Sequence, residues 1–249
     1  MDTTPLRWYN RQLIETLRYE GPHILLWRML RMCISPLGAM GLTTFCEKDL
    51  TQPLWEIRSK VLLNICQATV LNIEQLVTLV KRRYGPAKNM LGQYKNRGIR
   101  DNILERFQQG HRCFVGKIGT EIVHYNWVFF HRKESVAGTG RFITLRDDEA
   151  LMDDAYTAEA CRGKAIHTAV HNQMLLFLQQ TGYRKAYTVV NSDNKSSQKT
   201  HRRLGWKISG TMFYFIPRGT EKAWICRING TLTPFAEKQT PILTIKTER

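Results

Sequence analysis

The sequence contains no long hydrophobic run and no sign of a cleavable leader. No stretch approaches the roughly 20 consecutive apolar residues that a membrane-spanning helix needs. Residues 1–10 lack the short apolar core and small-residue cleavage site of a secretory signal. Both absences favour a protein of the cytoplasm.

Paired cysteines are also missing. The six cysteines lie far apart and include no C-x-x-C pair, which argues against a disulfide framework and against a thiolate zinc site. His167 and His171 have the spacing of a zinc-binding pair, but position 168 is Thr instead of the Glu of H-E-x-x-H. We therefore expect no metal site and a reducing compartment.

Acidic residues are scarce relative to basic ones. The chain has 37 Lys and Arg against 21 Asp and Glu, a net charge of +16, and 43% of its 249 residues are hydrophobic, enough for a folded core. A charge this positive is typical of nucleic-acid binding. The sequence has no zinc-finger spacing, no basic region with heptads and no RNP-like aromatic motif. No nucleic-acid partner is therefore expected.

The acids that are present crowd into residues 147–159, which hold six of them. The following residues, 160–210, hold nine Lys and Arg and the single acid Asp193. An acidic patch beside a basic stretch indicates a ligand with an amine next to an anionic group, and the alternative is an ordinary solvated surface.

The N-terminal part of the chain differs from the rest. Apolar residues repeat at helical spacing over residues 4–17, and a second amphipathic helix is predicted over residues 22–34. The uncharged run 32–46 is interrupted by Ser-Pro and by glycines, and it predicts a turn and loop. We interpret residues 1–53 as an N-terminal helical extension and residues 54–249 as the main domain.

The helix predicted over residues 22–34 is basic, with Arg28 and Arg31 on one face. Such a helix either makes peripheral contact with a membrane surface or packs on the main domain as a lid.

The sequence pattern of the main domain predicts strands and helices in the order β-α-α-β-β-β-α-β-α-β-β. This order is typical of a mixed sheet with helices on both faces. Strands are expected near residues 61–68, 111–118, 121–130, 150–157, 186–190, 210–216 and 222–228, and helices near 72–80, 101–109, 166–178 and 196–204.

The join between the strand ending near residue 157 and the next helix reads A-C-R-G-K-A-I-H over residues 160–167. Free backbone N–H groups at such a helix N-terminus bind phosphate, aided by the helix dipole. Arg162 and Lys164 add cationic side chains to the same anion site.

Two motifs in this region resemble those of the GNAT superfamily of N-acetyltransferases. Residues 162–167 resemble its pyrophosphate loop, Q/R-x-x-G-x-G/A, with Ala165 and His167 where the family prefers glycine. About 30 residues on, residues 194–206 resemble N-x-x-A/S-x-x-x-Y-x-x-x-G-F/W, with His201 at the usual tyrosine position. The resemblance covers roughly residues 55–230.

This resemblance implies an α/β fold with a GNAT-like mixed, mostly antiparallel central sheet flanked by helices. It implies acetyl-CoA, or another acyl-CoA, as the cofactor, and direct attack of an acceptor amine on the thioester. The pantetheine arm would lie in a gap between the fourth and fifth strands, about residues 156–157 and 188–190, and the pyrophosphate would lie on the loop. The implied cofactor-binding residues are Tyr156, Thr157, Arg162, Gly163, Lys164, Ala165, Ile166, His167, Asn194 and Ser197.

The reaction also needs proton transfer. An ammonium acceptor must lose a proton before it attacks, and a carboxylate serves as base. Asp154, Asp153 and Glu159 are the candidates, with Asp154 preferred. His201 is the candidate acid for the leaving thiolate.

The expected acceptor is a small molecule with an amine, and we favour an amino sugar of surface polysaccharide synthesis. Transfer from a longer acyl-CoA or from acyl-carrier protein stays open. So does a GNAT fold that binds CoA or nucleic acid without turnover, because two glycines and the tyrosine are replaced.

Overall fold

The computed structural model describes residues 21–84, 98–133, 143–220, 223–230 and 243–244. The helices are α2 (Pro22–Ile34), α3 (Ile73–Tyr84), α4 (Ile99–Gln108), α5 (Ile166–Gln180) and α6 (Lys195–Arg203), with short 3-10 turns at Val70–Asn72 and Glu159–Cys161. The strands are β1 (Gly38–Asp49), β2 (Asn64–Gln67), β3 (Arg112–Ile118), β4 (Glu121–Phe130), β5 (Arg132–Lys133), β6 (Ile143–Thr144), β7 (Glu149–Thr157), β8 (Lys185–Asn191), β9 (Lys207–Pro217), β10 (Trp224–Gly230) and β11 (Leu243–Thr244).

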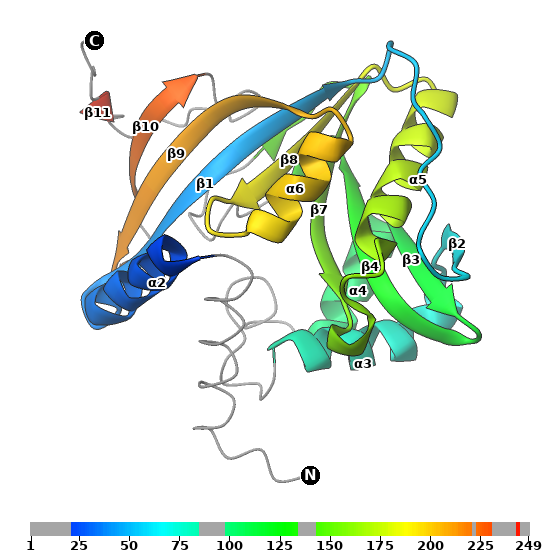
Figure 1. Cartoon of the computed structure of the whole chain (residues 1–249), viewed down its shortest axis with the longest axis horizontal. Helices are drawn as coiled ribbons and strands as arrows, with labels where there is room; N and C mark the ends of the chain where they lie inside the picture. Colours follow the sequence, from blue (N-terminus) through cyan, green and yellow to red (C-terminus); the bar gives the residue numbers. More distant parts are fainter. Residues whose placement is uncertain (1–20, 85–97, 134–142, 221–222, 231–242, 245–249) are drawn as a thin grey trace, which may run out of the picture.

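The described strands form one nine-stranded sheet in the order β11-β10-β9-β1-β8-β7-β4-β3-β2, and β5 pairs with β6 separately. Within the described part of the large sheet, β7 with β8 and β10 with β11 are parallel and the other neighbours are antiparallel. Helices flank this sheet (Figure 1). The prediction of a mixed, mostly antiparallel sheet flanked by helices is confirmed.

Strand β4 lies in the middle of the core, and only its first residue is exposed. Successive side chains of a strand point to opposite faces. Asn126 reaches His171 of α5, whereas Tyr125 reaches Arg83 of α3 and Trp127 packs on Phe107 of α4. One face of β4 is therefore covered by α5, and the other by α3 and α4.

The prediction of a turn and loop over residues 32–46 is wrong, because residues 38–49 form strand β1. It is inserted between β8 and β9, with Thr43 opposite Asn191 and Gly41 opposite Tyr214. A Cβ at position 41 would lie 2.4 Å from the Tyr214 hydroxyl, so this glycine permits a close approach of two strands. Glycine in an uncharged run predicts a turn. The residues of β8 that pair with β1 and make it a strand lie about 150 residues further along the chain.

The helix predicted over residues 22–34 is confirmed as α2, and the helix predicted over residues 4–17 lies outside the described residues. The proposed extension 1–53 is thus not helical throughout, because β1 belongs to the central sheet. The domain boundary after residue 53 stays a prediction.

The two parallel strands β7 and β8 separate along their length. Their ladder runs from Glu149 with Lys185 to Met152 with Thr188 and then stops, although β7 continues to Thr157. Figure 1 shows the strands diverging below this point. Beyond Met152 and Thr188, the two strands are therefore no longer paired with each other.

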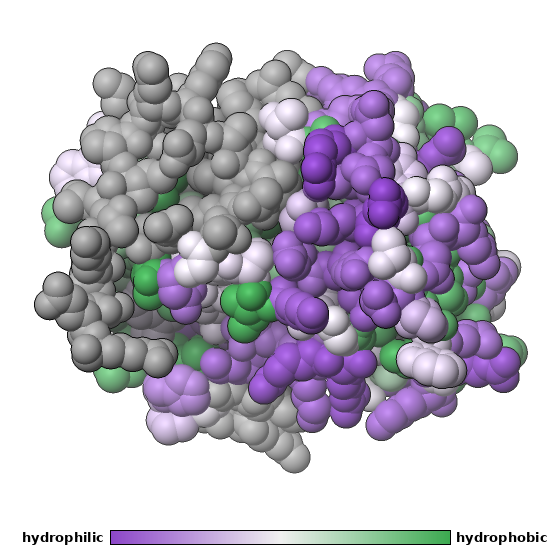
Figure 2. Space-filling model, turned by 90° about the horizontal axis from the view of Figure 1, so that it is seen from above, coloured by the Kyte–Doolittle hydropathy of each residue, from purple (hydrophilic) through white to green (hydrophobic). Residues whose placement is uncertain are grey.

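Seen from above, the described surface is mostly hydrophilic, and its hydrophobic residues form small separate areas (Figure 2). Among the helices that the structure describes, none has the length and apolar content needed to cross a membrane.

Candidate functional site

A cavity of about 220 Å³ opens where β7 and β8 separate. Its walls come from both strands, from Asn126 of β4, and from α3, α5 and α6. We call it the split-strand cavity. It lies at the gap in which the resemblance placed the pantetheine arm.

A β-bulge in β7 forms one wall of the split-strand cavity. Tyr125 pairs with Tyr156 and Trp127 pairs with Asp153, so Asp154 and Ala155 together face the single residue Asn126. Asp154 has a φ of 57°, in the left-handed region. The bulge interrupts the ladder and brings residues 153–155 to the cavity.

The Asp154 carboxylate is held by two arginines. Its Oδ1 accepts a hydrogen bond from Arg83 Nη1 at 2.5 Å, and its Oδ2 accepts one from Arg106 Nη1 at 2.6 Å. Its side chain is only 4% exposed, so the two guanidinium groups compensate a buried charge. Arg106 in turn lies over the Trp127 ring at 4.9 Å. Both oxygens are engaged, which favours a role in holding the bulge over a role as a free base.

The other two predicted bases differ from each other in their position relative to the cavity. Asp153 lines the split-strand cavity. It pairs with Trp127, and directly paired residues project to the same face, so Asp153 is on the α3 and α4 side of the sheet. Glu159 is exposed on the 3-10 turn after β7 and does not line the cavity.

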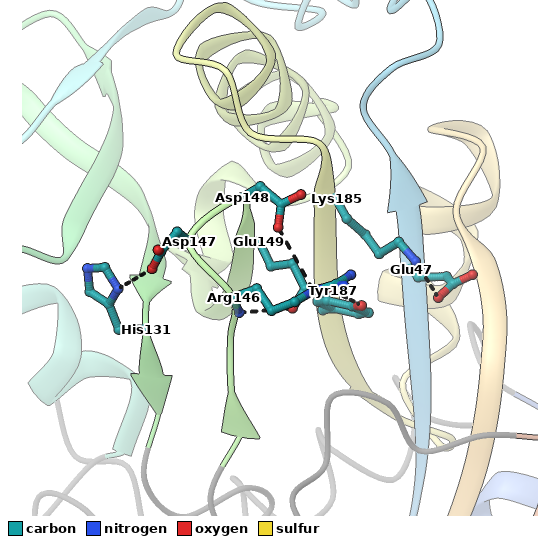
Figure 3. A network of polar contacts seen from close by, with 8 residues as sticks. All are labelled: Glu47, His131, Arg146, Asp147, Asp148, Glu149, Lys185 and Tyr187. Carbon is teal, nitrogen blue, oxygen red and sulfur yellow. Dashed lines mark hydrogen bonds and ion pairs between the residues drawn. The ribbon is translucent and has the colours of Figure 1, made fainter.

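The acids of residues 147–159 do not form one patch. Glu149 is buried at the far end of β7, where its Oε1 accepts hydrogen bonds from Arg146 Nη2 at 2.8 Å and from the Tyr187 hydroxyl at 3.0 Å. Figure 3 shows this network continuing through Asp148 and, separately, pairing Asp147 with His131. These contacts close the end of the sheet where β7 and β8 are still paired.

The N-terminus of α5 and the loop before it, residues 162–168, form a turn that we call the α5 cradle. No side chain caps the helix, and no acid stands in its first turn. The backbone N–H groups of residues 163–168 make no hydrogen bond to a backbone group in the described parts of the chain. Gly163 and Ala165, with φ of 79° and 58°, shape the loop that aims these groups. A row of unpaired N–H groups at a helix start suits a phosphate.

The loop cations lie beside this cradle. Arg162 is exposed, and its guanidinium lies 5.8 Å from the Tyr156 ring centroid. The Lys164 carbonyl accepts a hydrogen bond from the Lys60 N–H at 3.0 Å, which ties the loop to the segment before β2. Ile166 is buried and anchors the first turn of α5 in the core.

Two of the remaining predicted cofactor residues, Asn194 and Ser197, border the split-strand cavity at the start of α6, whereas Tyr156 and Thr157 at the end of β7 do not line it. Asn194 caps α6, with its Oδ1 accepting from the Ser197 N–H at 3.0 Å. Both residues line the cavity. The Thr157 hydroxyl lies 2.8 Å from His124 Nδ1. Of the predicted cofactor residues, His167, Asn194 and Ser197 line the cavity, and their role in binding a cofactor stays a prediction.

Four of the seven histidines gather beside the split-strand cavity, which the sequence analysis missed. The ring centroids of His124 and His167 are 5.3 Å apart, those of His167 and His171 are 5.4 Å apart, and those of His171 and His201 are 4.8 Å apart. They come from β4, α5 and α6. Only the His167 and His171 spacing is visible in the sequence.

Burial keeps these histidines neutral. It is the largest cause that lowers the pKa of each of the four, and neighbouring imidazoles lower three of them further. The pKa of His167 falls to about 3. His201 Nδ1 donates to the Ser197 carbonyl at 2.7 Å, which leaves its Nε2 without a proton. This geometry makes His201 an acceptor at neutral pH, and its predicted role as an acid stays a prediction.

The Nε2 atoms of His124, His171 and His201 are buried and have no hydrogen-bond partner within the described structure. The same holds for Asn126 Oδ1 and for Trp206 Nε1. Among the described residues, no group of three His, Cys, Asp or Glu side chains is placed to hold a metal ion.

Comparisons with known proteins agree with this geometry. Residues 91–206 match the model of the acetyltransferase (GNAT) family. A search of the curated proteins finds no match to the sequence. Among solved structures, a GCN5-related N-acetyltransferase from Sphaerobacter thermophilus is similar, with 12% identity, a TM-score of 0.51, and coverage of 74% of this chain and 54% of that one.

An N-acetyltransferase from Staphylococcus aureus Mu50 is similar over 66% of this chain and 94% of its own, with 15% identity and a TM-score of 0.48. The Sphaerobacter thermophilus structure supports the fold alone, and the family model describes residues 91–206 alone. Residues 91–206 of this chain therefore match an acetyltransferase domain of the GNAT family.

Proposed function

We propose that this protein transfers an acetyl group from acetyl-CoA to an acceptor amine by direct attack. One observation carries the proposal: the split of β7 and β8 opens a cavity directly beside the uncapped N-terminus of α5. A phosphate-binding cradle next to a narrow polar cavity suits a thioester on a phosphorylated carrier.

The residues present fit acetyl-CoA. The N–H groups of residues 163–168 and the side chains of Arg162 and Lys164 would hold its pyrophosphate. When bound, acetyl-CoA supplies an activated acyl group. The cavity of about 220 Å³ must also hold the end of the pantetheine arm, which supports a short acyl group over a long one.

Negative charge develops on the carbonyl oxygen during attack, and it needs fixed donors. The bulge at residues 153–155 interrupts the β7 ladder beside the cavity, so its backbone can supply them. The ion cluster of Asp154 with Arg83 and Arg106 holds that backbone in place.

Proton removal from the acceptor needs a base at the cavity. We assign this role to Asp153, which lines the cavity, in preference to the arginine-bound Asp154 and the exposed Glu159. His201 would act through its Nε2 as a hydrogen-bond acceptor for the incoming group.

The acceptor is proposed to be a small amine, with an amino sugar of surface polysaccharide synthesis as the first choice. A cytoplasmic location is part of the proposal. Cys33, Cys46, Cys66, Cys113 and Cys161 are free thiols, which fits a reducing compartment.

The test is calorimetric titration with acetyl-CoA, CoA and octanoyl-CoA. We expect one saturable site for acetyl-CoA that is lost in the double variant Arg162→Gln/Lys164→Gln. Asp153→Asn should reduce turnover of amino-sugar acceptors at least tenfold with unchanged acetyl-CoA affinity. Glu159→Gln, which removes an exposed carboxylate, is the matched control.

Absence of binding by every acyl-CoA would refute the proposal. Binding without turnover, together with nucleic-acid binding that weakens steeply with salt, would favour the non-catalytic alternative. Preference for octanoyl-CoA would favour a longer-chain acyltransferase.

A further inference from the structure

A second cavity lies outside the split-strand cavity, between α2, the start of β1 and the end of β9. Its volume is about 570 Å³. We call it the α2 groove. Its lining includes Arg28 and Arg31 of α2, residues 38–40 of β1, and Arg218 just after β9.

The α2 groove carries an excess of positive charge. Three arginines line it, and none of its described lining residues is an acid. Asp193 contacts two of these arginines, with its Oδ2 3.2 Å from Arg31 Nη1 and 3.9 Å from Arg28 Nε. Arg218, just after β9, brings a further positive charge to the groove. Arginine forks are suited to phosphate, which they can bind through two parallel hydrogen bonds.

The α2 groove and the split-strand cavity share a border. Asp193 belongs to the loop between β8 and α6, and its neighbours Asn191 and Asn194 line the split-strand cavity. The Ser192 N–H donates to the Leu42 carbonyl at 2.8 Å, which fastens this loop to β1. A molecule in the groove therefore lies across one loop from the site proposed for acyl transfer.

We infer that the α2 groove binds a phosphate or diphosphate group of the acceptor, so that the acceptor is a phosphorylated amine. The inference rests on the proposed function for the identity of the bound molecule as an acceptor. Anion binding by the groove does not rest on it.

Two sources share this chemistry: a soluble sugar phosphate or nucleotide-linked sugar, and a phosphate-linked lipid. A phosphate-linked lipid is considered because apolar side chains of α2 lie exposed beside the groove. Leu26, Met29, Leu30 and Met32 are 46–70% exposed. They would contact the lipid surface from which such an acceptor is presented.

The first experiment titrates the full chain with inorganic pyrophosphate in the presence of saturating CoA, which occupies the α5 cradle. We expect a remaining pyrophosphate site that weakens about tenfold in Arg218→Gln, the loss of one charge-assisted contact. Arg31→Gln should weaken it as well. Arg184→Gln removes an exposed arginine at the far end of β8 and should leave the affinity unchanged.

If CoA itself does not bind, the proposed function fails, and the same titration is made on Arg162→Gln/Lys164→Gln, in which the cradle is disabled. This titration tests anion binding by the α2 groove independently of CoA binding. The inference is overturned if no pyrophosphate site remains under these conditions, or if Arg218→Gln and Arg31→Gln both bind like the parent.

The second experiment separates the two sources. Cosedimentation with phosphatidylglycerol vesicles, but not with phosphatidylcholine vesicles, and its loss in Arg218→Gln would assign the phosphate to a lipid. Pyrophosphate binding without vesicle binding would assign it to a soluble acceptor. For the latter, glucosamine 1-phosphate should exceed glucosamine in kcat/KM about tenfold, and Arg218→Gln should remove the difference. Equal kcat/KM for both acceptors in the parent, with no vesicle binding, would overturn the inference that the groove serves the acceptor.

Discussion

Because several histidines are buried, we expect the free energy of unfolding of this protein to fall between pH 7 and pH 5.5. Burial lowers the pKa of His124 and His171 well below that of an unfolded histidine, and it lowers the pKa of His167 to about 3. Below pH 6.5 the unfolded chain therefore binds protons that the folded chain excludes. Stability is fully present above the unfolded pKa and falls as the pH drops through it.

The magnitude follows from the unfolded pKa of about 6.5. Each histidine that stays neutral in the folded state costs about 1.3 kcal/mol between pH 7 and pH 5.5. The three together cost about 4 kcal/mol, a large share of a typical unfolding free energy of about 5–15 kcal/mol. This pH range lies above the carboxylate range, so acid titration of Asp and Glu adds little.

The assay is urea unfolding followed by circular dichroism at pH 7.0, 6.5, 6.0 and 5.5. His171→Gln should reduce the pH dependence by about one third, whatever it costs in packing at pH 7. A free energy of unfolding that is constant from pH 7 to pH 5.5 would refute the reasoning.

Three further substitutions test other parts of the site. Arg106→Met leaves the buried Asp154 with one guanidinium and should cost about 3 kcal/mol in urea unfolding; a cost below about 1 kcal/mol would contradict the ion cluster. Gly41→Ala places a Cβ against the Tyr214 ring and should cost about 1–3 kcal/mol, much of it recovered in the double variant with Tyr214→Ala; additive losses would contradict the contact. Ala165→Gly relieves a left-handed alanine and should raise stability by about 1 kcal/mol without weakening acetyl-CoA binding, and a loss in unfolding assays would argue against this loop geometry.

The local elements of the fold were predictable. The helical repeat of α5 and the hairpin of β3 and β4 around Gly119 depend on residues close together in the chain. The anion cradle at residues 162–167 was found for the same reason, since its N–H groups belong to one turn.

The catalytic assignments needed the tertiary structure. Asp154 was preferred as the base because of its place on the strand before the loop, but Arg83 and Arg106 lie 71 and 48 residues away from it. No pattern around Asp154 indicates that two arginines would take both of its oxygens. The bulge that exposes residues 153–155 arises from the register with β4, which a single strand does not reveal.

The sequence by itself determined the family resemblance, the mixed sheet and the position of the loop proposed to bind phosphate, because each depends on local periodicity or on a short motif. The tertiary structure alone decided that β1 lies between β8 and β9, that four histidines meet, and that the α2 groove borders the split-strand cavity. These features depend on contacts between distant segments. Their formation is governed by the packing of the whole sheet and its helices, and no local stretch of sequence encodes it.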